Sequence, residues 1–293
     1  MPDPIALTEK KLLSELDLLL REVERQIQKS VSKLNQKDVR EGLKVGERAA
    51  LQQSLIVRAE LRGILETAGK LYVSEVREGI ILVAQEIVEG DPVLPSEFTV
   101  NPAQAVEDVI SRQIDELDQV FIDSGDLIRK GIMRATVSGT SFDPVMDEIE
   151  KRMKITKEQA KVVVTTSVHA SARTAMVEVA EDSGLDYVYR YTGPDDRITR
   201  PFCRFYGFPE GPSSKVAYTR EALKALARDP NQKKQPAGKT GDTRSFAGGW
   251  NCRHNWSPIP LFIAERDNFE IRGFDDVLAL IRGGGSTVYG RTS

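Results

Sequence analysis

Apolar residues in the first third of the chain recur at the three- and four-residue spacing of amphipathic helices. One run begins after Thr8 and ends near Leu34, and a second extends from about Val45 to Val88. Charged residues fill the remaining positions, so each helix has one apolar stripe to bury. The stripes could bind a partner's helices, but packing against each other explains them more simply. The pattern predicts long N-terminal helices in a bundle or hairpin.

The middle of the chain continues in helical periodicity with clear start signals. Asn101-Pro102 begins a helix that reaches about Thr136, with Ser124-Gly125 as a point of interruption. Asp143-Pro144 opens a short helix. Thr156, followed three residues later by a glutamine, has the signature of a capping box. It therefore predicts a new helix from Thr156 to Asp182.

After Gly184 the periodicity changes. Residues 186–191 alternate as in a strand, residues 218–227 suit a short helix, and residues 256–262 suit an edge strand because their prolines cannot donate to an inner ladder. The predicted fold class is mainly α, with long N-terminal helices followed by a small α+β domain that contains a short antiparallel sheet. The predicted organisation is a helical region 1–91, a connector and helix 92–139, the α+β domain 140–262 and a C-terminal tail 263–293.

Composition and charge exclude several protein classes. The 293 residues are 40% hydrophobic and 29% charged, which is typical of a folded protein. Two cysteines do not suit a disulfide framework, no apolar run reaches the ~18–20 residues of a membrane span, and the N-terminus lacks the features of a signal peptide. We expect synthesis in a cytoplasm and no contact with a membrane.

Positive charge is concentrated in one segment. Residues 188–254 hold 13 Lys and Arg against 6 Asp and Glu, a balance of +7 in a chain whose net charge is -3. Such a segment could face a polyanion, although solvated loops also collect basic residues. The candidate nucleic-acid contacts are Arg220, Lys224, Arg228, Lys233, Lys234 and Lys239.

The rarest residues of the chain fall in two short boxes. The first box, residues 195–207, contains Cys203, and the second, residues 248–254, contains Cys252 and His254. Two thiols and an imidazole are suitable ligands for zinc, with Asp196 as a further candidate. The two cysteines could equally form a disulfide or stay a plain buried thiol pair. Asp195, Asp196 and His254 could serve a metal-assisted nuclease, or the boxes could be purely structural. The candidate structural residues are Asp195, Arg197, Arg200, Gly207, Trp250 and Arg253.

The boxes also resemble a known family. The pattern Asp-x-Arg-x-x-Arg-Pro-x-Cys, followed by Gly-Trp-Asn-Cys-Arg-His, is similar to the head-morphogenesis domain of tailed-phage minor head proteins, the Mu protein F-like family. The resemblance covers roughly residues 140–260 and includes Arg173-Thr174 in the preceding helix. It departs from the commonest form by ending in Cys-x-His. Since cysteine and histidine exchange as metal ligands but not as disulfide partners, this departure favours a metal or polar cluster.

The resemblance implies a function in the virion. We expect a minor head protein, present in several copies near the portal, that acts in head assembly and in organising or releasing packaged DNA. Its implied partners are the portal protein, double-stranded DNA, and the major capsid or scaffold protein. The sequence contains no phosphate-binding loop, dinucleotide fingerprint or nucleophile elbow, so a non-enzyme is expected. The alternatives are a metal-dependent nuclease or toxin-like effector, and a purely mechanical portal adaptor.

Overall fold

The computed structural model describes residues 4–44, 47–90, 94, 100–138, 141–211, 213–232, 247, 252 and 254–283. The chain divides into two compact units. One consists of Met1–Thr8, Ile80–Ser111 and Thr165–Ser293, and the other of Glu9–Gly79 and Arg112–Val164. Each of the four longest helices contributes residues to both units, so this division runs across helices rather than between them.

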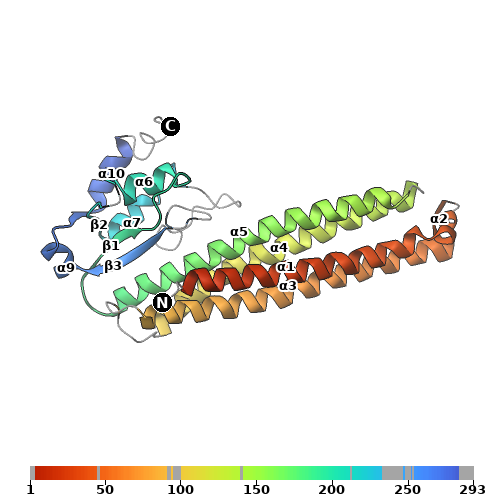
Figure 1. The fold of residues 1–293 in the computed structure, drawn as a ribbon, viewed down its shortest axis with the longest axis horizontal. Coiled ribbons are helices and arrows are strands. Elements are labelled where there is room, and N and C mark those ends of the chain that lie inside the picture. The colour runs from red at the N-terminus through yellow and green to blue at the C-terminus, as the bar shows by residue number, and fades with distance from the viewer. Residues whose placement is uncertain are drawn as a thin grey trace. The chain divides into compact units, whose positions relative to one another are not determined.

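Long helices account for most of the described chain, as the sequence predicts (Figure 1). They are α1 (Pro4–Ser32), α3 (Arg48–Gly90), α4 (Val100–Ser138) and α5 (Asp143–Asp182), with the 3-10 helix η1 (Lys33–Asn35) and α2 (Lys37–Lys44) between the first two. No helix among the described residues is both long and apolar enough to cross a membrane.

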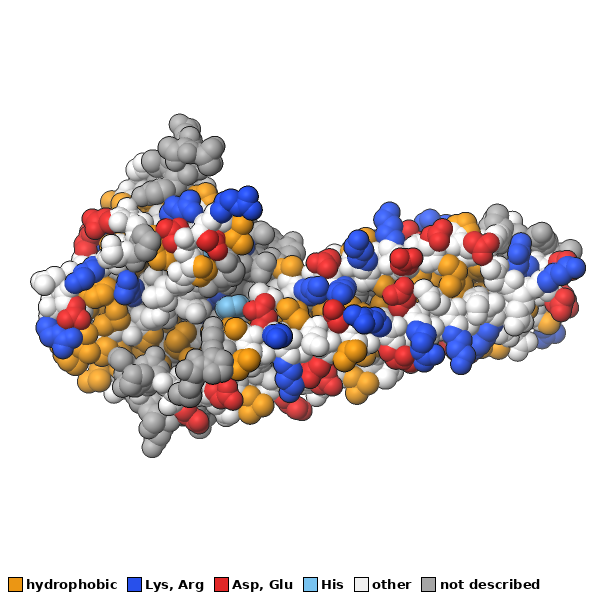
Figure 2. Space-filling model, in the orientation of Figure 1, with side chains coloured by type: hydrophobic (Ala, Val, Ile, Leu, Met, Phe, Trp, Pro, Cys, Tyr) orange, Lys and Arg blue, Asp and Glu red, His pale blue; other side chains and the backbone are white. Residues whose placement is uncertain are grey.

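The unit Glu9–Gly79 with Arg112–Val164 is a four-helix arrangement. The Tyr72 hydroxyl of α3 donates to the carbonyl of Leu12 in α1 at 2.7 Å, and Lys157 of α5 pairs with Asp17 of α1 at 2.9 Å. Each helix buries one stripe, and acidic and basic side chains alternate over the visible outer faces (Figure 2). The stripes predicted from the sequence thus pack mainly against one another.

The predicted helix boundary at Thr156 is wrong, because α5 is continuous from Asp143 to Asp182. Thr156 is fully buried, its hydroxyl donates to the carbonyl of Arg152 at 2.8 Å, and it lies 2.6 Å from the Ser124 hydroxyl. The capping-box pattern is met by chance, since a threonine inside a helix can bond the preceding turn. Ser124-Gly125 likewise lies within continuous α4 and does not interrupt it.

The other unit contains a four-stranded sheet in the order β3-β1-β2-β4. Its elements are β1 (Tyr187–Thr192), α6 (Pro201–Gly207), β2 (Val216–Tyr218), α7 (Arg220–Leu226), β3 (Asn255–Pro260), α9 (Leu261–Arg266), β4 (Glu270–Arg272) and α10 (Phe274–Arg282). β1 pairs antiparallel with β2 and β3, but β4 runs parallel to β2. The sheet is therefore mixed rather than wholly antiparallel. β3 lies at the edge, as its prolines require.

Residues 263–283 are part of this unit and not a tail. β4 pairs with β2, and Val277 of α10 is completely buried in the core. The sequence signal for a strand is weak here because β4 has only three residues. The strand is held by its pairing with β2. Residues 284–293 lie outside the described part of the chain.

The core of this unit forms on one face of the sheet. Large aromatic side chains from the strands pack against α6, α7 and α10 and against Val177 of α5. Along α5, residues 170–177 are all buried, so the last turns of this helix are enclosed rather than amphipathic. This enclosure places α5 beside the segment that precedes β3.

The hydroxyl pair between α4 and α5 yields a stability prediction. Ser124→Ala or Thr156→Ala should each lower the free energy of unfolding by about 1 kcal/mol, the usual net value of a buried hydrogen bond. The double variant should lose less than the sum of the two, because both changes remove the same bond. Urea denaturation of the three variants measures this coupling.

Gln159→Ala is the matched control. Gln159 is exposed in the middle of α5, so its replacement should be neutral. In a true capping box the same change would cost roughly 1 kcal/mol, and such a loss would contradict the continuous helix.

Candidate metal centre

The structure brings Cys203 together with Cys252 and His254, which lie some fifty residues later in the sequence, and all three are buried. Cys203 lies in the first turn of α6, and the other two residues directly precede β3. The two sulfur atoms are 3.7 Å apart, and the Cys252 sulfur lies 3.6 Å from Nδ1 of His254. One ligand atom from each residue lies within 4.8 Å of the other two.

These separations are close to those of a tetrahedral zinc site. Bonds of ~2.3 Å to sulfur and ~2.0–2.1 Å to nitrogen, at the tetrahedral angle, put two sulfurs ~3.8 Å apart and a sulfur ~3.6 Å from a nitrogen. A disulfide would need its sulfur atoms at ~2.05 Å, so both cysteines are thiols here. The three side chains could hold a metal with small adjustments.

The histidine tautomer also suits metal binding. Nε2 of His254 lies 2.9 Å from the carbonyl oxygen of Pro194, which can only accept a hydrogen bond. Nε2 therefore carries the proton, and in the neutral ring Nδ1 presents its lone pair towards Cys252. A hydrogen bond from the other ring nitrogen to a carbonyl is the usual support of a metal-binding histidine.

The two thiols differ in acidity. The hydrogen bond from Cys203 lowers the pKa of Cys252 well below its usual value, helped by the positive charge of Arg173. The same hydrogen bond, together with burial, raises the pKa of Cys203. A thiolate is the form that binds metals.

Tyr191 of β1 completes the cluster. Its hydroxyl donates to the Cys203 sulfur at 3.3 Å and lies 3.4 Å from the Cys252 sulfur. Burial raises the pKa of this phenol well above its usual value, so it stays a hydrogen-bond donor. Its ring also stacks on His254, with centroids 5.2 Å apart and planes inclined by 5°.

Arg173 of α5 holds the second box in place. Its side chain is 1% exposed, and its Nε donates to the carbonyl of His254 at 2.6 Å. Another nitrogen of the guanidinium donates to the carbonyl of Cys252. Burial lowers the pKa of Arg173, while the nearby thiols oppose that shift. A charged donor at two ligand carbonyls fixes the backbone on which both ligands depend.

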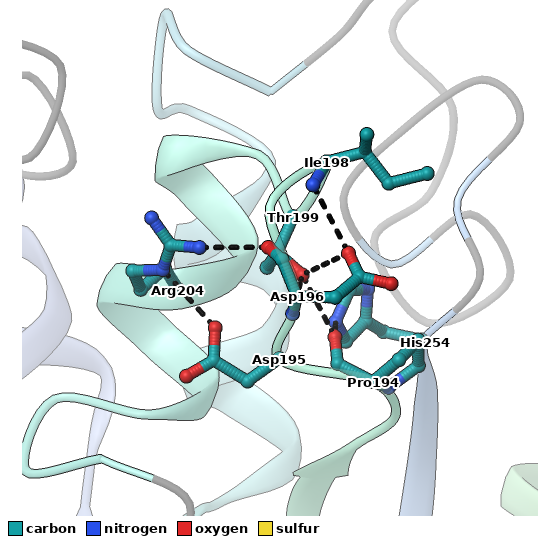
Figure 3. A network of polar contacts seen from close by, with 7 residues as sticks. All are labelled: Pro194, Asp195, Asp196, Ile198, Thr199, Arg204 and His254. Atoms are coloured by element: carbon teal, nitrogen blue, oxygen red, sulfur yellow. Dashed lines mark hydrogen bonds and ion pairs between the residues drawn. The ribbon is translucent and has the colours of Figure 1, made fainter. Parts of the chain in front are cut away.

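The acidic residues of the first box build a turn rather than join the cluster (Figure 3). Asp196 is not among the clustered ligands. Its carboxylate accepts from the backbone of Ile198 at 3.1 Å and from the Thr199 hydroxyl at 3.2 Å. Asp195 accepts from Arg204 of α6 at 3.1 Å. This turn positions the Pro194 carbonyl, which receives the His254 hydrogen bond.

Two glycines permit close approach at the centre. A Cβ on Gly207 would lie 2.5 Å from the ring of Tyr191, so the first-box glycine is required by packing. Gly193 has a φ of +145°, a backbone conformation that residues with a side chain rarely adopt. A Cβ there would also lie 2.6 Å from the ring of His254, so there is no space for a side chain. Of the other box residues, Arg197 is exposed and Arg200 half-buried, while Trp250 and Arg253 lie outside the described residues.

The candidate nucleic-acid contacts that the structure describes are engaged within the chain. Arg220 pairs with Glu181 at 2.7 Å, and Lys224 approaches Glu221 at 3.7 Å. Arg228 lies over the ring of Phe274, 5.1 Å from its centroid. The remaining three, Lys233, Lys234 and Lys239, lie outside the described residues.

Sequence reasoning missed Tyr191 and gave Arg173 no role at the site. The signal for Arg173 was present, because it is the one charged residue, with histidine counted as neutral, in the stretch 162–177 of an otherwise small and apolar helix. Nothing comparable marks Tyr191, since aromatic residues are ordinary in strands.

Comparison with known proteins adds no relative. No protein-family model matches the sequence, and neither the curated proteins nor the solved structures yield a match. The functional argument therefore depends on the residues and their geometry.

Arg173→Met should destabilise the unit that contains the centre. Each hydrogen bond from a charged donor is worth roughly 1.5–3 kcal/mol, so losing those to two buried carbonyls should cost about 3 kcal/mol or more. Chemical denaturation measures the loss. Arg197→Met, on an exposed side chain, is the control and should leave the free energy of unfolding within about 0.5 kcal/mol. Equal effects of the two changes would contradict this role of Arg173.

Proposed function

We propose that the chain is a minor head protein of a tailed phage, and that a zinc ion bound by Cys203, Cys252 and His254 ties together its two sequence boxes. The observation that carries the proposal is their convergence on one buried cluster of two sulfurs and a nitrogen. Among the described residues that carry the resemblance to the Mu protein F-like family, Cys203, Cys252 and His254 form this cluster and Asp195 lies in the turn beside it.

A structural role for the metal follows from the surroundings of the cluster. Cys203, Cys252 and His254 are each 3% exposed or less, so a substrate has no direct route to the ligands. Zinc would supply cross-linking between α6 and the segment before β3, with no redox chemistry of its own. Metal binding to such a site adds directly to folding free energy.

Protein purified without a chelator should contain about one zinc per chain by elemental analysis. Cys203→Ser should lose most of the metal and lower the melting temperature, and a chelator should lower that of the unchanged protein, because the ion binds the folded form. Ser214→Ala, at another buried position of the same unit, should keep the metal. Full stability in a chelator, with no metal at purification, would favour a metal-free core.

The nuclease alternative receives less support from the geometry. A metal-dependent nuclease needs acidic ligands and an open coordination position for water. The described cluster contains no carboxylate, and Asp195 and Asp196 are engaged in the turn. DNA incubated with the protein and Mg²⁺, Mn²⁺ or Zn²⁺ should remain intact. Cleavage abolished by Asp196→Asn would replace the structural proposal by an enzymatic one.

DNA contact is a separate part of the proposal. Because Arg220, Lys224 and Arg228 have partners within the chain, the contact is assigned to the segment that holds Lys233, Lys234 and Lys239. Lysines bind phosphate through charge alone, which gives sequence-independent and salt-sensitive binding. A purely mechanical adaptor at the portal would bind no DNA.

Position in the particle tests the head assignment. Purified virions should contain the protein in a few copies, and labelled antibody or electron-microscopic density should place it inside the head near the portal. Its presence in the lysate but not in purified virions would argue for an effector, and density confined to the tail would exclude the head assignment.

A further inference from the structure

A second surface lies between α3 and α4 of the helical unit, within Glu9–Gly79 and Arg112–Val164. The two helices run antiparallel in a constant register. Ser54 meets Thr136 through a 2.8 Å hydrogen bond, a Cβ on Gly125 would lie 3.0 Å from Leu65, and one on Gly69 would lie 3.5 Å from Phe121. This register allows side chains on the outer flanks of the two helices to be matched.

The matched positions near the end of the helix pair are apolar and exposed. Leu55 is 61% exposed and lies within one helical turn of the level of Met133, which is 43% exposed. One helical turn further, Leu51 at 41% and Val137 at 83% form a second such pair. The spacing of four residues on each helix places the pairs in line along the groove between the helices.

The line of apolar pairs leads to a recess at Gly125. The recess has a volume of about 290 Å³ and is lined by the apolar side chains of Leu65, Phe121 and Ile122. Its charged walls are two ion pairs, Arg62 with Glu66 and Arg129 with Asp126, at 2.6 Å each. The absence of a side chain at Gly125 keeps the recess open, because a Cβ there would touch Leu65.

The groove is also basic. Residues 48–66 and 121–138, which include the recess, contain six Lys and Arg against four Asp and Glu, in a chain that is acidic overall. Nε of Arg58 and Nε of Arg129 are buried and have no hydrogen-bond partner among the described residues. These buried Nε atoms lie out of a ligand's reach. The excess of positive charge beside an apolar groove is what favours a ligand that brings carboxylates.

We propose that this groove binds an amphipathic helix of a partner protein, with its apolar face on the groove and acidic residues along its flanks. At 1.5 Å per residue, Met133 lies ~12 Å from the Gly125 recess along α4 and Val137 a further ~6 Å. A helix lying along the groove therefore presents apolar residues at about i, i+8 and i+12, which share one helical face. The one at i enters the recess.

A second copy of this chain and a lipid bilayer are the other occupants that an apolar and basic surface could have. Both fit the groove less well. A second copy of this chain would bring the same excess of positive charge to its own groove, which is unfavourable. A lipid bilayer presents no projecting side chain to fill a recess walled by ion pairs. The groove geometry and the charge together select an acidic helix.

The test uses a synthetic helical peptide of about 18 residues with leucines at the three anchor positions and glutamates on both flanks. A second peptide carries lysine in place of each glutamate. Binding to the full-length protein is measured by fluorescence anisotropy. The acidic peptide should bind at least about tenfold more tightly than the basic one, since several charge contacts change sign.

Matched variants locate the binding to the groove. Gly125→Ala narrows the recess and should weaken the acidic peptide about tenfold, while Gly63→Ala, which meets nothing within 4 Å, should not. Leu55→Glu should weaken it similarly through repulsion. Leu71→Glu should not weaken binding. Leu71 is also exposed, at 60%, but it lies ~160° around α3 from Leu55. Circular dichroism verifies that each variant is folded.

Three outcomes would overturn the proposal. The first is equal or tighter binding of the lysine peptide, and the second is binding that Gly125→Ala and Leu55→Glu leave unchanged. The third is failure of both peptides to bind, in which case two further measurements identify the occupant. Sedimentation that shows dimers lost in Leu55→Glu would assign the groove to a second copy. Leu55-dependent binding to phosphatidylserine–phosphatidylcholine vesicles would assign it to a membrane.

Discussion

The buried guanidinium of Arg173 is the interaction on which the candidate centre depends. It donates to the carbonyls of Cys252 and His254, so it attaches the second box to α5 before any metal is considered. A buried cation is costly unless its donors are satisfied. The chain satisfies them with backbone oxygens of the residues whose side chains form the cluster. The hydrogen bonds of Arg173 therefore fix both the position of α5 and the backbone of two ligand residues.

The acidic residues of the first box serve the centre indirectly. Asp196 stabilises the turn that presents the Pro194 carbonyl, and that carbonyl selects the proton position on His254. A carboxylate close to two thiols is easily interpreted as a ligand or a catalytic base. Here its hydrogen bonds go to backbone and hydroxyl groups, which is how short polar loops usually satisfy their donors. In this structure the two carboxylates of the box therefore hold the turn.

The helical unit buries some of its polar groups without using charge. Two of the polar contacts among the helices are hydroxyl pairs, Ser124 with Thr156 and Ser54 with Thr136, which fit between apolar layers without charge. The α3–α4 groove departs from this, because it leaves apolar side chains exposed and gives the Nε groups of Arg58 and Arg129 no hydrogen-bond partner within the described part of the chain. Surfaces of this kind are uncommon on a closed bundle and are typical of interaction sites.

The sequence by itself determined the helical stripes, the edge position of β3 and the gathering of both cysteines and one histidine in two boxes, because these depend on local periodicity and composition. It misplaced a helix start at Thr156, since a hydroxyl that caps a helix can equally bond inside one. It also missed the parallel β4 and the part played by Tyr191. Only the tertiary structure decided these, because strand pairing and side-chain contacts across the sheet join residues whose separation in sequence carries no local signal.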